Sequence, residues 1–195
     1  MQESPTSLRI SELEHNPHHH SDSAVKKSLP SLRNIDSTHL IGGDLDDTEL
    51  FDQNAGTASV SYKNGDRYIG EVINGAIKQG KGKFMFANGD IYDGLFKNDK
   101  FDGYGIFTCS EYTYEGDWKA GRKCGDGEIK YSDGEKYIGE FDNDMFEGYG
   151  TYTYANGDCY EGNWKHGKRS GEGKLVKSNG EEIYGLWENN ELVTK

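Results

Sequence analysis

The sequence predicts an all-β protein: an elongated, single-layer, twisted antiparallel sheet of tandem β-hairpins, preceded by a disordered N-terminal tail. Three observations lead to this fold class. A Tyr-x-Gly-x-aromatic pattern recurs about every 23 residues, a Gly-x-Gly pattern follows it in each unit, and turn-forming dipeptides separate the units. A fixed period of this length is typical of repeat architectures.

The first strand of each unit lies on the Tyr-x-Gly-x-aromatic pattern. Side chains alternate across a strand, so Tyr160 and Trp164 share an apolar face, whereas Glu161 faces water. The array therefore holds about five to six hairpin units. Their first strands read YIGEV, YDGLF, YEGDW, YIGEF, YEGNW and IYGLW, starting near residues 68, 92, 114, 137, 160 and 183.

The second strand of each unit follows the Gly-x-Gly pattern, which runs from Gly80/Gly82 to Gly171/Gly173. A glycine has no Cβ and leaves a flat place on which the ring of a neighbouring strand can lie. The dipeptides before the next unit tolerate the positive φ angles of a tight hairpin turn. They are Asn64-Gly65, Asn88-Gly89, Asp133-Gly134, Asn156-Gly157 and Asn179-Gly180.

The first 58 residues differ in composition from the rest of the chain. Every tyrosine and tryptophan lies between Tyr62 and Trp187, whereas this stretch holds all three prolines and is rich in Ser, Asp and His. It cannot bury enough apolar surface to offset the entropy of ordering it. We expect residues 1–58 to form a disordered, acidic tail and residues 59–195 to form the repeat array.

The repeat resembles the MORN repeat. The run YEGNWKHGKRSGEGKLVKSNG is similar to the family pattern of Tyr-x-Gly-x-Trp followed by Gly-x-Gly, and the likeness extends over roughly residues 60 to 190. Arrays of this family that accompany lipid kinases, a protein methyltransferase or membrane-junction proteins leave activity to a separate domain, so the resemblance implies no enzymatic activity. Stand-alone arrays resemble components of radial spoke heads, cytoskeletal scaffolds and motor adaptors. The resemblance implies a protein–protein interaction scaffold or adaptor, cytoskeletal or ciliary (axonemal).

The aromatic positions are the first candidate site. A single layer would leave its aromatic face partly open, and large exposed apolar patches mark binding surfaces. We expect a groove that receives a helix or an extended segment of a protein partner. The alternative is that the rings stack on their own glycines and need no partner. The groove would be lined by Tyr92, Phe96, Tyr114, Trp118, Tyr137, Phe141, Tyr160 and Trp164.

The charged loops are the second candidate site. Basic loops are expected along one long edge of the sheet, and acidic loops, from Asp66 to Glu182, along the other. A basic rim could dock phospholipid phosphates or an acidic partner, which makes a peripheral membrane adaptor the alternative function. Charge for solubility is the other interpretation. The basic rim would hold Lys97, Lys100, Lys119, Arg122, Lys123, Lys165, Lys168 and Arg169.

Charge and motifs disfavour other functional classes. The formal net charge of −12 disfavours nucleic acid as a partner. The segment 75–82 ends in Gly where a phosphate-binding loop needs Ser or Thr, and the segment 142–148 places its Gly too late for a calcium loop. The tract His18–His20 is interpreted as a solvated polar run. We predict no metal and no cofactor.

The remaining expectations concern location and assembly. The N-terminus lacks the apolar core of a secretory signal and the cysteines show no disulfide framework, so we expect a cytoplasmic, cytoskeleton- or cilium-associated protein. Strand edges near Val60 and near Val193 could pair between chains, which leaves a homo-oligomer open. The sequence decides neither the partner nor the role of the tail.

Overall fold

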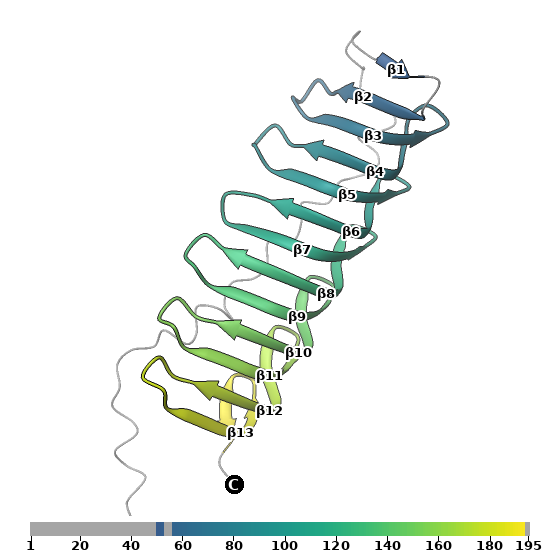
Figure 1. Cartoon of the computed structure of the whole chain (residues 1–195). Coiled ribbons are helices and arrows are strands. Elements are labelled where there is room, and N and C mark those ends of the chain that lie inside the picture. The colour runs from purple at the N-terminus through teal and green to yellow at the C-terminus, as the bar shows by residue number, and fades with distance from the viewer. Residues whose placement is uncertain (1–49, 53–55, 194–195) are drawn as a thin grey trace, which may run out of the picture.

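The computed structural model describes residues 50–52 and 56–193, with side chains described from residue 56 onward. The described residues form fourteen strands in one antiparallel sheet, in which each strand pairs with its neighbours in the sequence. Successive hairpins lie side by side in an elongated, twisted array (Figure 1). This arrangement confirms the predicted all-β fold of tandem hairpins.

The sheet extends slightly beyond the expected array. β1 and the start of β2 lie ahead of residue 58, so the sheet begins inside the stretch assigned to the tail, while residues 1–49 lie outside the described part of the chain. The strands are β1 (Leu50–Asp52), β2 (Thr57–Ser61), β3 (Arg67–Ile73), β4 (Ile77–Met85), β5 (Ile91–Lys97), β6 (Lys100–Thr108), β7 (Tyr112–Lys119), β8 (Arg122–Tyr131), β9 (Lys136–Asp142), β10 (Met145–Thr153), β11 (Cys159–Lys165), β12 (Lys168–Val176), β13 (Glu182–Glu188) and β14 (Glu191–Val193).

Each hairpin bends at a bulge beside its glycines. In the β5–β6 hairpin Gly94 lies opposite Gly105, and the register then shifts so that Phe96 lies opposite Phe101. Gly103, inside the bulge, has a φ of 99°, which favours glycine. The same shift recurs in β3–β4, β7–β8, β9–β10 and β11–β12. In each hairpin we call the part between the bulge and the turn that joins its two strands, at Asn98-Asp99 in β5–β6, the short arm. The remainder of the hairpin, up to the turns of the Asn-Gly type, is the long arm.

The bend encloses the aromatic rings on one face of the sheet, which we call the inner face. A Cβ added to Gly116 would lie 2.6 Å from both the Tyr114 hydroxyl and the Asp126 carbonyl oxygen, so only glycine lets the ring lie against the backbone there. The Tyr114 hydroxyl donates to the carbonyl oxygen of Asp117, at the bulge, over 2.9 Å. The fully buried tyrosines of the pattern are Tyr68, Tyr92, Tyr114, Tyr137 and Tyr160.

The core alternates with a period of two hairpins. Phe101 stacks on Tyr92 with ring centroids 3.6 Å apart, and Phe146 stacks on Tyr137 at 3.8 Å. In the other hairpins the position of Phe101 and Phe146 holds a cation, and each cation lies over the equivalent tyrosine ring. These cations are Lys78, Lys123 and Arg169, all buried.

The turns that join the two strands of each hairpin alternate between two kinds, in step with the core. Asp144 accepts a hydrogen bond from the Lys123 backbone N–H at 2.9 Å, and its carboxylate lies 3.9 Å from the Lys123 Nζ. In the preceding hairpin the turn ends in Gly121, whose N–H donates to the carbonyl of Phe101 over 2.8 Å. The repeating structural unit is therefore a pair of hairpins, in which a carboxylate or amide accompanies each buried cation.

Candidate interaction surfaces

The eight aromatic residues predicted to line an open groove lie in the core. All are at most 3% exposed, because the short arms cover the inner face. The prediction of an open aromatic groove was therefore wrong, and the rings pack on their own glycines and on each other. The residues concerned are Tyr92, Phe96, Tyr114, Trp118, Tyr137, Phe141, Tyr160 and Trp164.

The polar atoms of these rings are occupied by the chain itself. The Trp118 indole N–H donates to the carbonyl of Gly105 over 3.2 Å, and that of Trp164 donates to the carbonyl of Gly150 over 3.1 Å. Burial raises the pKa of Tyr160 to about 12, with Arg169 acting in the opposite direction. The inner face thus serves stability.

The opposite, outer face of the long arms exposes apolar side chains. Tyr104 is 52% exposed, Tyr149 is 53% exposed and Tyr184 is 67% exposed. Exposed aliphatic side chains accompany them on this face, at Ile69, Ile106, Ile138 and Leu186. Apolar groups gathered on one unpartnered face are typical of a binding surface.

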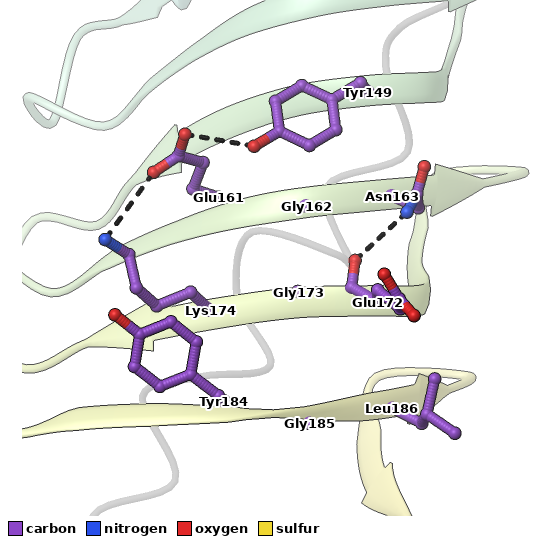
Figure 2. A pocket seen from close by; sticks show the side chains of 10 residues that line it. All are labelled: Tyr149, Glu161, Gly162, Asn163, Glu172, Gly173, Lys174, Tyr184, Gly185 and Leu186. Carbon is purple, nitrogen blue, oxygen red and sulfur yellow. Dashed lines mark hydrogen bonds and ion pairs between the residues drawn. The ribbon is translucent and has the colours of Figure 1, made fainter.

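A groove of about 610 Å³ crosses this face over β10 to β13 (Figure 2). Its floor is backbone, because the glycines in the middle of adjacent strands lie opposite one another. These glycines have the same strand parity as the buried rings, since a Cβ on Gly173 would meet the Tyr160 ring on the inner face, and they therefore contribute only backbone to the outer face. The floor residues are Gly162, Gly173 and Gly185.

The walls of the groove combine rings with charges. The Tyr149 hydroxyl donates to the Glu161 carboxylate over 3.0 Å, and the Lys174 Nζ lies 3.8 Å from the other oxygen of that carboxylate (Figure 2). The hydrogen bond to Glu161 raises the pKa of Tyr149. Tyr184 and Leu186 line the groove at the end formed by β13. The site is therefore amphipathic.

Acidic side chains occupy the outer face over β7, β8 and β9. Glu115 lies opposite Glu128, and Asp126 lies opposite Glu140. Such like-charge pairs destabilise a sheet. Lys130 relieves one of them, at 2.7 Å from Glu128, and lowers the pKa of that carboxyl. We call the set the acidic stripe; it comprises Glu115, Asp117, Asp126, Glu128 and Glu140.

Six of the eight residues predicted for the basic rim lie beside the turns that join the two strands of a hairpin. They are exposed and form three cross-strand pairs of like charge, which we call the basic stripe: Lys97 with Lys100, Lys119 with Arg122, and Lys165 with Lys168. The prediction was wrong for Lys123 and Arg169, which are 0% and 4% exposed. Each follows an exposed residue of the stripe by one position, so strand alternation points it into the core.

The two buried cations that had been predicted for the basic rim, Lys123 and Arg169, have distinct partners. The Lys123 Nζ donates to the Tyr112 hydroxyl over 3.3 Å and lies 4.9 Å from the centre of that ring. Burial lowers the pKa of Lys123 to about 8, while the Asp144 carboxylate opposes the shift. The Arg169 guanidinium lies 4.3 Å from the Trp187 ring and donates to the Asn190 carbonyl over 2.6 Å.

The acidic loops at the other edge join successive units. Asp66 accepts from the backbone N–H of Ala87, and Asp158 from that of Ser178, both over 2.8 Å. Glu135 is buried and accepts from the Tyr152 hydroxyl over 2.7 Å. These carboxylates have structural partners, which gives the predicted acidic rim a role in stacking the hairpins.

The described residues contain neither a metal-binding cluster nor a membrane-spanning helix. Between residues 56 and 193 no three His, Cys, Asp or Glu side chains are placed to share a metal ion, and the tract His18–His20 lies outside the described residues. No helix with the length and apolarity of a membrane span occurs in the part of the chain that the structure describes.

Sequence reasoning missed the outer-face tyrosines. Tyr104 and Tyr149 each stand between the two glycines of a Gly-x-Gly pattern. Strand alternation places that middle residue on the face opposite to the buried rings. The pattern Gly-Tyr-Gly was therefore the available signal for an exposed ring.

Comparisons with known proteins agree with the repeat units. Residues 68–91, 92–113, 114–136, 137–159 and 160–182 match the family model described as MORN repeat. No curated protein sequence matches the chain significantly. Among solved structures, the chain is similar to the TCP domain of SAS-4 (dCPAP) of Drosophila melanogaster, in complex with a proline-rich motif of Ana2 (dSTIL). The TM-score is 0.44 and the identity 11%, over 71% of this chain and 76% of that chain.

Proposed function

The chain belongs to the MORN-repeat family, and from this premise we propose that it is a non-catalytic scaffold that binds a protein partner on the outer face of its sheet. MORN repeats commonly serve as scaffolds for interactions with proteins and membranes. The observation that carries the proposal is the contrast between the two faces. The inner rings are buried by the chain itself, whereas Tyr104, Tyr149 and Tyr184 are exposed on the outer face.

The outer groove fits an extended segment better than a helix. Its glycine floor lies between the rings of Tyr149 and Tyr184, on strands β10 and β13, which are about 14 Å apart at ordinary strand spacing. That length accommodates about four extended residues, which suits a short strand-like segment lying across the sheet. A helix would need about nine residues to cross the same span, and its diameter of about 10 Å would hold its backbone away from the floor.

We assign the partner to the cytoskeleton or the ciliary axoneme. The support is the likeness of the repeats to the stand-alone arrays of radial spoke heads, cytoskeletal scaffolds and motor adaptors. The elongated shape agrees with such a role, because fourteen strands at the usual spacing extend over about 60 Å and can hold partners apart.

Capture from extracts tests the proposal. The full chain is compared with the variant Tyr149→Ser, Tyr184→Ser, Leu186→Ser, in which only exposed side chains change. A matched control, Lys97→Glu, Lys100→Glu, Lys119→Glu, alters the basic stripe instead. We expect axonemal or motor proteins, identified by mass spectrometry from ciliated cells, to be lost by the first variant and kept by the second. Equal capture by wild type and the first variant, with equal thermal midpoints, would exclude the outer face.

The second candidate function is a peripheral membrane adaptor. The observation favouring it is the basic stripe, since three like-charge pairs facing one another across strands are unfavourable without an anion. Sedimentation with vesicles containing acidic phospholipids tests it. Binding lost in the basic-stripe variant and retained in the outer-face variant would favour the membrane, and binding by neither protein would remove this candidate.

Self-association through a strand edge is a third proposal. β14 pairs with only three residues of β13, from Leu186 to Glu188, so the segment 182–185 has a strand neighbour on one side only among the described residues. Such an edge can pair with another chain. Sedimentation at several protein concentrations decides the matter: a mass that rises toward the dimer supports it, and a constant monomer mass contradicts it.

A further inference from the structure

We propose that the segment 23–35 of this same chain docks on the outer face, across the acidic stripe, beside the groove assigned to the protein partner. The inference rests on the proposed function in one respect, namely that the outer face is a binding surface. Segment 23–35 precedes the described residues, and it is identified here by its charge and its apolar residues.

The outer face has an excess of negative charge that the described residues leave unneutralised. No described cation forms an ion pair with Asp117, Asp126 or Glu140, although two of these lie directly opposite one another. Apolar side chains lie next to the carboxylates of the stripe, because Ile106 on β6 is opposite Glu115 and Ile138 on β9 is opposite Glu128. An occupant that satisfies both features is basic and carries aliphatic residues at short intervals.

Segment 23–35, SAVKKSLPSLRNI, has this composition. It has no acidic residue, although Asp22 and Asp36 flank it, and it carries Lys26, Lys27 and Arg33. Its aliphatic residues are Val25, Leu29, Leu32 and Ile35. In an extended conformation, the stretch from Lys26 to Arg33 would be roughly 23 Å long. The strands that carry the acidic stripe, β7 to β9, together with their neighbours β6 and β10, extend over about 19 Å at ordinary strand spacing.

The connection is long enough for docking within one chain. Residues 36–49 separate the segment from β1 and reach up to about 50 Å when extended. β1 and β8 are seven strands apart, or about 34 Å. A tether of this length holds the segment at an effective concentration near the millimolar range, so weak contacts suffice.

Photo-cross-linking in the full chain tests this inference. Leu29 is replaced by the photoreactive benzoylphenylalanine, the protein is irradiated at low concentration, and the cross-linked peptides are identified by mass spectrometry. We expect cross-links within one chain to the outer face of β6–β10. The variant Lys26→Glu, Lys27→Glu, Arg33→Glu changes nothing in the sheet and is expected to lower their yield roughly tenfold.

Charge reversal on the sheet should rescue docking of the charge-reversed segment. Adding Asp117→Lys, Asp126→Lys and Glu140→Lys to the reversed segment should restore the cross-links, whereas reversing Lys97, Lys100 and Lys119 in the wild-type chain should leave them unchanged. Cross-links that spread over the sheet, join two chains in proportion to concentration, or persist after segment reversal would overturn the inference. A chain that binds its partner through the outer face yet shows no such cross-links would overturn it as well, and would leave the proposed function standing.

Discussion

Phe101 lies flat on Tyr92, with ring centroids 3.6 Å apart and an angle of 6° between the planes, whereas the equivalent place over Tyr114 is taken by the ammonium group of Lys123. The core thus uses aromatic stacking and cation–π contact in turn. The turn of the next hairpin places the Asp144 carboxylate beside Lys123. The corresponding turn next to Phe101 ends instead in Gly121, whose N–H donates to the Phe101 carbonyl. The two kinds of hairpin are not interchangeable.

Exchange of the residues at these two positions should have opposite effects. Phe101→Lys would bury a cation beside Gly121, which offers no carboxylate, and should destabilise the protein by about 3–5 kcal/mol. Lys123→Phe would copy the stacked arrangement and should leave stability unchanged or raise it by about 1–2 kcal/mol. Urea unfolding followed by tryptophan fluorescence measures both. Equal losses in the two variants would contradict the alternation of core types.

Lys123 should make stability depend on pH. Burial lowers its pKa to about 8 in the folded protein, so between that pH and its ordinary pKa the unfolded chain binds the extra proton. Its contribution to the free energy of unfolding should therefore rise with pH across this window, by about 3 kcal/mol at most. Buried tyrosines such as Tyr114, whose pKa burial raises, act in the opposite direction above about pH 10.

The comparison that isolates the lysine is wild type against Lys123→Met, from pH 7.5 to 10. The tyrosine contribution is common to both proteins and cancels in the difference. We expect the stability advantage of the methionine variant to shrink as pH rises. A difference that does not change with pH would show that Lys123 keeps an ordinary pKa in the folded state.

The glycines beneath the rings should tolerate no methyl group. Gly116→Ala places a Cβ 2.6 Å from the Tyr114 hydroxyl and from the Cα of Gly127, and should cost at least about 3 kcal/mol, because the backbone cannot withdraw. Gly121→Ala is the matched control, since its position has a positive φ and open space, and should cost about 1 kcal/mol. Thermal unfolding of the two variants provides the measurement, and a reversed order would refute the ring-on-glycine packing.

The acidic stripe should favour binding of a basic segment and lower the stability of the sheet. Asp126→Lys replaces repulsion of Glu140 by attraction and should raise the thermal midpoint by about 2 °C. In a chain whose own segment is reversed by Lys26→Glu, Lys27→Glu and Arg33→Glu, and so leaves the stripe free, Asp126→Lys should weaken binding of a peptide with the wild-type sequence of segment 23–35 several-fold, as measured by fluorescence anisotropy at low salt. Unchanged peptide binding would leave the stripe without a role in recognition.

The fold was predictable because the repeat encodes it several times over. The Tyr-x-Gly-x-aromatic starts and the Asn-Gly turns located the hairpins, and they agree with β5 (Ile91–Lys97) and the turn at Asn88-Gly89. The bulge was not predicted. It depends on the positive φ of Gly103, and a single Gly-x-Gly pattern does not distinguish a bend from a flat strand.

The missed bend accounts for the error in the candidate site. A flat sheet would have exposed Tyr92 and Trp118, whereas a sheet bent at each bulge encloses them. The same oversight placed Lys123 and Arg169 on the basic rim, although strand alternation alone directs them inward once the turn residues are fixed. The rings are buried because the short arm of each hairpin packs against its long arm. A local sequence pattern does not predict this contact.

The central claim, that the outer face is the binding face, is tested most directly by hydroxyl-radical footprinting of the full chain alone and with its captured partner. Tyr149 and Tyr184, which line the groove, should be oxidised in the free protein and protected in the complex, while Tyr92 and Tyr114 stay unreactive in both because they are buried. Outer-face tyrosines that remain equally reactive in the complex, with protection confined to the basic stripe, would contradict the account.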